Sequence, residues 1–225
     1  MLFGGAVTSD ALELRRKSDG SFRVSGRFPY GKTTTLSDGG RNGGRPRKEK
    51  FAPLAFSFRV EKPDEEIYLL SGHDWNRPLA SKLTGGLQLK DARDALTFTA
   101  TISPEVAETS HGRDAIALLS SGLSVGLSPG FRVPPPRAVP DAEEIEEEAN
   151  DGTLDENGDP RRGALIRNVR AALLYELSIV TRQQYAEASV EARNWKPQQT
   201  VENLAASNEG LSRLVTGMAA MNRWR

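Results

Sequence analysis

The feature that most constrains the fold is the apolar stretch from Ala164 to Val180, the longest strand signal in the chain. Glu176 lies in the middle of its second half. A carboxylate in such a run is expected to be at least partly buried, and a buried charge without a partner is costly. Glu176 therefore needs a partner. An arginine such as Arg170 or Arg132 would make a structural ion pair, whereas a histidine would make a functional one.

Other segments also predict strands, and few predict helices. Strands are expected at residues 21–28, 66–70, 87–89, 96–102 and 123–133, those at 87–89 and 96–102 as a hairpin, and residues 51–56 are expected to return apolar side chains to the core. One helix is expected from Ser110, as its N-cap, to a stop at Gly122, and a short amphipathic helix at 211–218. The polar segments 31–50 and 137–163 are expected to be flexible loops. The fold class is thus α+β and mostly β, a barrel or sandwich with a few helices.

A chain of 225 residues fits one domain with a tail. We divide it into an N-terminal extension at 1–20, a main domain at 21–190 with an acidic insertion at 137–163, and a C-terminal tail at 191–225. The absence of cysteine excludes disulfides and thiolate metal sites, and two histidines disfavour a histidine zinc site. No apolar stretch approaches the ~18 residues of a membrane span. We expect a soluble, intracellular protein that needs no cofactor.

The formal charge is zero overall, but it is unevenly distributed. Residues 1–60 hold twelve Lys and Arg against five Asp and Glu, whereas residues 141–159 hold ten Asp and Glu and no Lys or Arg. The favoured interpretation is two solvated loops. The alternative is docking of an acidic partner on the segment from Lys32 to Lys50.

Three polar residues lie in or beside apolar strand-like runs, at intervals of about fifty residues: His73, Ser124 and Glu176. In a serine hydrolase an imidazole takes the serine proton and an acid orients the imidazole. The order His, Ser, acid is not that of chymotrypsin, subtilisin or the α/β-hydrolases. Spacing alone favours Ser124 as a packing residue of a tight strand. His111 is the rival base, but it lies at a predicted helix start, where an imidazolium is disfavoured.

Two other motifs are interpreted as chance matches. Gly26 to Thr33 matches the phosphate-loop pattern, with Lys32 as its lysine, but the residues that follow do not favour the helix which that mechanism needs. Asp151 to Asp159 superficially suggests a calcium loop, but the required glycine and glutamate are missing in both registers.

Four segments together resemble the prohead (head maturation) serine protease family of tailed bacteriophages. They are Lys48–Phe56, Leu69–Asp74, Ser121–Val133 and Leu174–Thr181, which are similar to that family's E-R-F-x-P-G-A-F, x-x-N-H-D, S-G-x-S-x-G-F and L-x-E-V-S-L-V segments. The match covers about residues 22–190, in order. Leu54 replaces a usual glycine, and Gln183-Gln184-Tyr185 replaces a usual Pro-Ala-Tyr.

The resemblance implies a β-barrel flanked by helices, similar to the herpesvirus assembly proteases. It implies a serine endopeptidase that cuts scaffold, or the scaffold-like N-terminal region of the major capsid protein, and also itself. By matching position, Ser124 is the nucleophile, His73 the base and Glu176 the third member, a role for which His111 stays open. The N–H group of Val125 or Gly126 would face the oxyanion, where losing a donor costs ~10²–10³ in rate.

The expected location is the host cytoplasm, inside the procapsid. The expected partners are the capsid or scaffold substrates, with no nucleic acid and no membrane; a homo-oligomer is left open. The first rival is an inactive scaffold protein of the same fold. The second is a nucleotide-binding protein that uses Lys32.

Overall fold

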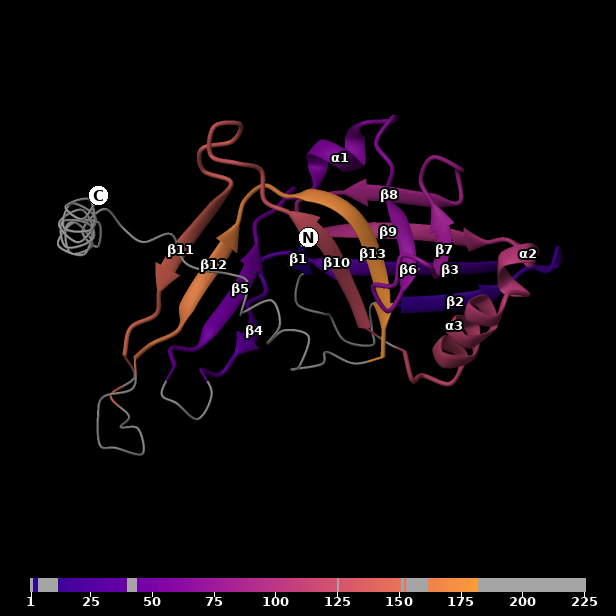
Figure 1. Cartoon of the computed structure of the whole chain (residues 1–225), viewed down its shortest axis with the longest axis horizontal. Helices are drawn as coiled ribbons and strands as arrows, with labels where there is room; N and C mark the ends of the chain where they lie inside the picture. Colours follow the sequence, from indigo (N-terminus) through magenta and orange to yellow (C-terminus); the bar gives the residue numbers. More distant parts are fainter. Residues whose placement is uncertain are drawn as a thin grey trace, which may run out of the picture. The chain divides into compact units, whose positions relative to one another are not determined.

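The computed structural model describes most of the first 181 residues, namely 2–3, 12–39, 44–124, 126–150, 152 and 162–181. The predicted helix at 211–218 and the whole of the predicted C-terminal tail at 191–225 fall outside these residues. Within them the chain is mostly β, as the sequence predicts, and forms three sheets (Figure 1). No helix of the described part is long and apolar enough to cross a bilayer.

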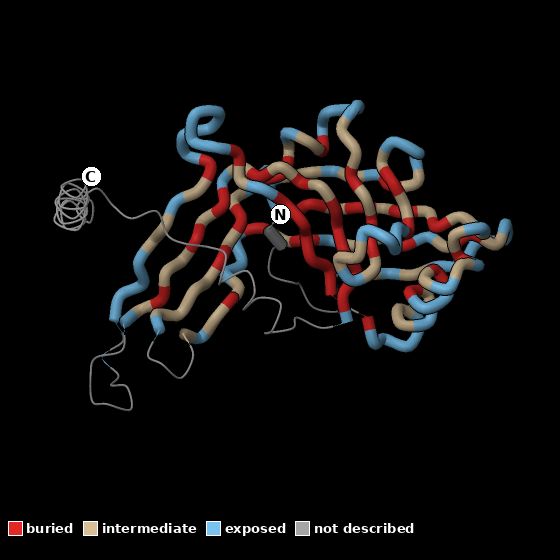
Figure 2. The backbone as a smooth tube through the Cα atoms, viewed as in Figure 1, coloured by how far each residue is buried: buried red, intermediate tan, exposed pale blue. Residues whose placement is uncertain are grey.

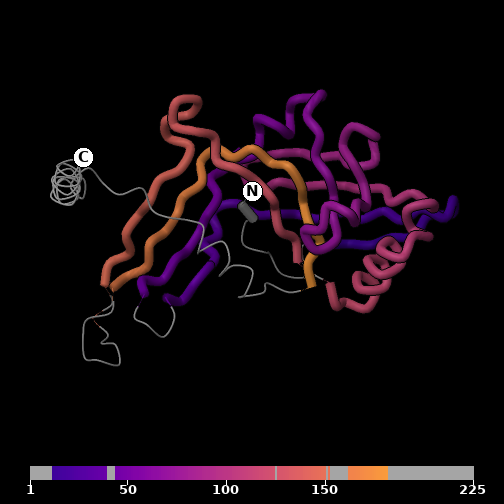
Figure 3. The backbone as a smooth tube through the Cα atoms, viewed as in Figure 1, coloured from indigo at the N-terminus to yellow at the C-terminus, as the bar shows by residue number. Residues whose placement is uncertain are grey.

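The first sheet, called here the site sheet, carries the three candidate residues on or beside its strands. Its strands in spatial order are β1 (Leu2–Phe3), β10 (Gly126–Arg132), β13 (Leu173–Val180), β6 (Tyr68–Ser71) and β7 (Pro78–Ser81). β13 is antiparallel to β10 and parallel to β6, so it is the middle strand. Figure 3 shows β10 and β13 running side by side.

The second sheet is built from antiparallel neighbours and contains the predicted hairpin. Its order is β2 (Leu12–Arg16), β3 (Phe22–Pro29), β9 (Ala95–Ile102) and β8 (Leu87–Asp91). β9 alternates buried and half-buried side chains over most of its length, which is the pattern of a strand with one face on the core. The strands predicted at 21–28, 87–89 and 96–102 are thus confirmed.

The third sheet, called here the arm sheet, was largely missed by the sequence patterns. Its order is β11 (Glu143–Glu147), β12 (Leu165–Val169), β5 (Arg47–Phe51) and β4 (Thr34–Ser37). The loops predicted at 31–50 and 137–163 are therefore wrong over these strands. In β5 and β11 the alternation is hidden because charged side chains occupy both faces. The single strand predicted at 164–180 is two strands, β12 and β13, separated at 170–172.

Ion pairs between the basic and acidic segments hold the arm sheet together. Lys50 Nζ lies 2.8 Å from Glu146 Oε2. Arg167, almost fully buried, contacts Glu143 at 2.7 Å and Glu49 at 3.2 Å. The interpretation of two separate solvated loops is therefore wrong, because the acidic segment is a partner of the chain's own basic segment.

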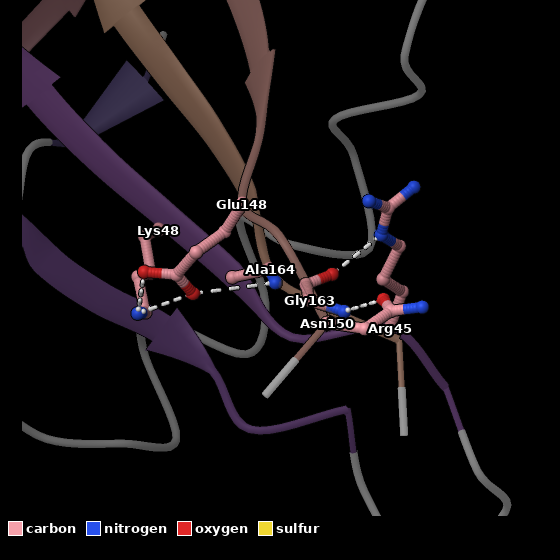
Figure 4. A network of polar contacts seen from close by, with 6 residues as sticks. All are labelled: Arg45, Lys48, Glu148, Asn150, Gly163 and Ala164. Carbon is pink, nitrogen blue, oxygen red and sulfur yellow. Dashed lines mark hydrogen bonds and ion pairs between the residues drawn. The ribbon is translucent and has the colours of Figure 1, made fainter. Parts of the chain in front are cut away.

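A network of hydrogen bonds and an ion pair joins the chain segments at the end of the arm sheet, as Figure 4 shows. The Glu148 carboxylate accepts from Lys48 Nζ at 2.8 Å and from the Ala164 N–H at 3.4 Å. Gly163 donates its N–H to Asn150 Oδ1 at 2.8 Å, and its carbonyl accepts from Arg45 Nε at 2.6 Å. A β-carbon at Gly163 would lie 1.9 Å from the Glu148 carbonyl oxygen, so only glycine fits there.

Three helices complete the described fold: α1 (Ser57–Glu61), α2 (Pro104–Ala107) and α3 (Ser110–Ser120). The predicted helix α3 is confirmed, and Gly122, with φ +69°, follows its end. The prediction of Ser110 as N-cap is wrong, because Thr109 accepts the Gly112 N–H at 3.0 Å. α1 was not predicted, since a single turn shows no helical periodicity.

The core lies mainly between the strands of the site sheet and of the second sheet, where Figure 2 shows the buried backbone in red. An aromatic cluster occupies part of it, with neighbouring ring centroids 5.1–6.2 Å apart: Phe28, Phe51, Phe56 and Phe131. None of the three sheets closes on itself within the described ranges, so the β-barrel stays a prediction.

Candidate active site

His73 lies just beyond the end of β6, in a turn that fixes its backbone. Gly72 donates its N–H to Ile179 O at 3.0 Å, which ties the turn to β13. His73 has a φ of 60°, a left-handed conformation that is uncommon outside glycine. Its N–H donates to Ser178 Oγ at 2.9 Å. The turn therefore points this side chain back toward the middle strand of the site sheet.

Glu176 lies on that middle strand and has no exposed surface. Its Oε1 is 2.8 Å from His73 Nδ1. Gly130 faces Glu176 across β10 and β13, and a β-carbon there would lie 2.0 Å from Oε1. The glycine therefore provides the space in which the carboxylate reaches the imidazole.

The prediction that Glu176 is buried with a partner is confirmed, and the partner is a histidine. The alternative arginines are engaged elsewhere: Arg170 pairs with Glu144, and Arg132 lies over the Tyr175 ring, 5.5 Å from its centroid. The interpretation of a structural arginine pair is therefore wrong.

The pair fixes the protonation pattern of the imidazole. An ionised carboxylate only accepts hydrogen bonds, so with Glu176 ionised the proton of this contact lies on His73 Nδ1. His73 Nε2 then keeps its lone pair and can accept a proton. The His73 side chain is 11% exposed, so a small part of it is accessible. This arrangement can act as a general base, and the carboxylate can stabilise the imidazolium that forms.

Ser124 lies between the end of α3 and the start of β10. Its N–H donates to Leu118 O at 3.0 Å, and the residue is 5% exposed. β10 and β6 flank β13, and Leu127, Ile179 and Ser71 lie in one row across the three strands. Neighbouring strands are about 4.8 Å apart, so the start of β10 and the end of β6 are about 10 Å apart. Ser124 and His73 therefore lie at the same end of the site sheet.

The structure thus brings two of the three predicted residues into direct contact and places the third at the same sheet end. No hydrogen bond joins the Ser124 hydroxyl to His73 in the described part of the chain. Catalytic hydrogen bonds are often long before substrate binds. His111 is held elsewhere, because its Nε2 lies 3.1 Å from Pro78 O. Val125, one of the two expected oxyanion donors, lies outside the described residues.

Two residues of the candidate site were missed by the sequence reasoning. Gly130 makes room for the carboxylate, and Ser178 donates its hydroxyl to Glu176 Oε2 at 2.7 Å. Ser178 could have been found, since it lies two residues after Glu176 and so shares its strand face. Gly130 could not, because its role depends on the register between two strands.

The phosphate-loop match fails on structural grounds, as predicted. Gly26 to Pro29 belong to strand β3, and β4 rather than a helix follows Thr33. No helix N-terminus is therefore available for a phosphate at this motif. The calcium-loop match at Asp151 to Asp159 lies almost entirely outside the described residues.

A mostly β domain with a buried histidine–carboxylate pair and a serine at one sheet end belongs among the candidates for nucleophilic hydrolysis. The family model for the caudovirus prohead serine protease matches residues 30–203 of the chain. The chain therefore belongs to this family, a family of serine proteases of phage capsid maturation. A search of curated proteins and a search of solved structures gave no match.

Proposed function

We propose that the chain is an active serine endopeptidase in which Ser124 is the nucleophile, His73 the general base and Glu176 the residue that orients the base. The observation that carries this proposal is the buried 2.8 Å contact between His73 Nδ1 and Glu176 Oε1. A buried carboxylate costs stability unless it is paired, and buried pairs of ionisable groups cluster at functional sites.

The reaction proceeds in two displacement steps. Ser124 Oγ attacks the peptide carbonyl carbon while its proton passes to His73 Nε2. The C–N bond then breaks, and Nε2 returns that proton to the leaving amine, which leaves an acyl ester on Ser124. Water, deprotonated by the same nitrogen, releases the acid and restores the hydroxyl. The Gly126 N–H at the start of β10, or that of Val125, would donate to the oxyanion.

Family membership implies capsid-protein substrates in general and action inside the procapsid. The proposal is more specific: the substrates are scaffold or the scaffold-like N-terminal region of the major capsid protein, and the protease also cuts itself. It acts inside the procapsid, in the host cytoplasm. A closed barrel similar to that of the herpesvirus assembly proteases is part of the same proposal.

The decisive experiment co-expresses the chain with its capsid and scaffold proteins and follows cleavage by mass spectrometry. Ser124→Ala is compared with Ser120→Ala, whose exposed hydroxyl only contacts Ile116 O at the end of α3. We expect Ser124→Ala to abolish cleavage and labelling by a fluorophosphonate probe, and Ser120→Ala to keep both. Undiminished cleavage by Ser124→Ala would exclude this nucleophile and favour the inactive scaffold reading.

A further inference from the structure

Ser178 is a buried serine on the strand that carries Glu176, and its hydroxyl connects the backbone of His73 to the Glu176 carboxylate. The Ser178 hydroxyl accepts the His73 N–H at 2.9 Å and donates to Glu176 Oε2 at 2.7 Å. The other carboxylate oxygen receives His73 Nδ1 at 2.8 Å. These three contacts close a ring through the His73 backbone, the serine, the carboxylate and the imidazole.

Each member of this ring limits a motion that the others leave open. If the hydrogen bond to His73 Nδ1 were its only contact, the Glu176 carboxylate could still turn about its terminal torsion. This torsion has a broad distribution of angles in glutamate side chains. The Ser178 hydroxyl holds the second oxygen and thereby sets the plane of the carboxylate. The same hydroxyl also accepts the backbone N–H of His73, whose φ of 60° is a conformation that the surrounding structure must hold in place.

The hydrogen of the serine hydroxyl is fully assigned by this arrangement. The backbone N–H of His73 can only donate, so Ser178 Oγ accepts there and its own proton goes to Glu176. A donated hydrogen bond stabilises the ionised carboxylate, which in turn holds the proton on His73 Nδ1 and leaves Nε2 as the unprotonated nitrogen that acts as base. Ser178 has no exposed surface, so it acts through its neighbours and not on substrate.

We propose that Ser178 is a positioning residue that keeps His73 in the Nδ1-protonated form and at the correct angle. This inference rests on the proposed function for its effect on rate. Its effect on the imidazole can be measured whether or not the chain cleaves peptides.

The experiment compares Ser178→Ala with a matched control, Ser81→Ala. Ser81 lies on β7 of the same sheet, is 7% exposed, donates to Glu66 Oε2 at 2.8 Å and accepts the Thr84 N–H at 3.3 Å. The control therefore removes an equivalent buried bridge between an N–H and a carboxylate. Any loss that follows from folding alone appears in both variants.

The readout is the imidazole itself, followed by nitrogen NMR of protein labelled with ¹⁵N-histidine. The chain has two histidines, so assignment needs only a His111→Gln variant. In the Ser124→Ala background, which prevents self-cleavage, we expect the parent and Ser81→Ala to show a downfield, slowly exchanging Nδ1 proton on His73. We expect Ser178→Ala to lose this proton signal and to show a mixture of the two ring tautomers.

Kinetics on the active chain give the second readout. A hydrogen bond to a charged group corresponds to about a 10- to 100-fold change in rate, and we expect Ser178→Ala to lower kcat by that factor with KM nearly unchanged. Ser81→Ala should stay within about twofold of the parent, as expected for a site outside the machinery.

The outcomes separate the two proposals. If Ser124→Ala still cleaves, the proposed nucleophile fails, and the NMR result still decides the role of Ser178. If Ser178→Ala does not fold, Ser178→Cys takes its place, because sulfur nearly keeps the volume but donates weakly. A folded Ala or Cys variant with the parent's Nδ1 proton signal and the parent's kcat would overturn the inference.

Discussion

Gly130→Ala is the sharpest test of the candidate site, because it changes the space beside Glu176 and no polar group. The added β-carbon would lie 2.0 Å from Glu176 Oε1 and 2.7 Å from its Cδ. Contacts under 3.0 Å essentially never occur for a β-carbon, so the carboxylate must retreat by at least about 1 Å. A displacement of this size away from His73 Nδ1 takes the 2.8 Å contact beyond hydrogen-bond distance.

The rate loss follows from the loss of the orienting acid. Replacing the acid of a serine protease triad lowers kcat about 10⁴-fold. The carboxylate of Gly130→Ala stays nearby, so we expect a loss of about 10²–10⁴ in kcat and a smaller change in KM. Overpacking a tight site also costs about 1–3 kcal/mol of stability.

The assay measures kcat and KM on a capsid-derived peptide, together with thermal unfolding. Gly86→Ala is the matched control, because its added β-carbon would meet its nearest neighbour, Thr101 O, at 3.4 Å, an ordinary contact. The double variant Gly130→Ala with Glu176→Asp separates the effect of the steric clash on stability from the effect of the lost His73 contact on kcat. The shorter side chain of the aspartate relieves the clash, so stability should recover while kcat stays low. A folded Gly130→Ala within about fivefold of the parent in kcat would refute the reasoning.

Four further predictions concern parts of the fold outside the site. Burial raises the pKa of the Asp91 carboxyl above 3.8, so the stability that this group contributes is present below pH 3.8 and lost as pH rises. In urea unfolding between pH 3 and 7, Asp91→Asn should therefore lose less stability with rising pH than the parent does. Tyr30→Phe removes the hydroxyl that donates to Asp91 and should cost about 1–3 kcal/mol in the same assay. Gly163→Ala forces a β-carbon against the Glu148 carbonyl, so limited proteolysis should cut the end of the arm sheet faster while kcat is unchanged. Arg167→Met removes the guanidinium from the buried Glu49 carboxylate and should lower the free energy of unfolding by about 3–5 kcal/mol, and a loss below 1 kcal/mol would contradict this.

The strands that the sequence predicted are those with one apolar face. β3 and β9 alternate along their length, and a period of two is readable without a partner strand. Two strands of the arm sheet were not predicted, because β5 (Arg47–Phe51) and β11 (Glu143–Glu147) carry charges at nearly every position. Ion pairs link the two segments across the intervening strand β12 and span about 100 residues of sequence, and no local pattern records such a contact.

In the candidate site, too, local features could be predicted from the sequence and contacts between distant strands could not. Glu176 could be predicted as a buried, paired group from its apolar flanks alone, since the cost of an unpaired buried charge is a local argument. Its choice of His73 over an arginine could not, because it depends on β6 lying parallel to β13. Ser124 was placed by motif and resemblance, and its role as nucleophile stays a prediction.

Strict alternation of side chains along β13 does not predict correctly which residues share a face with Glu176. Gly130 is paired with Glu176 and Phe131 with Leu174, so Tyr175 is an extra residue that forms a bulge. Strict alternation would put Leu174 on the carboxylate's face, yet Leu174 joins the same core cluster as Leu177 and Ile179. The bulge lets the apolar residues on both sides of Glu176 enter one core while the carboxylate faces Gly130 and His73. An apolar strand can therefore hold an ionised group at its centre because one inserted residue separates the packing face from the chemical face.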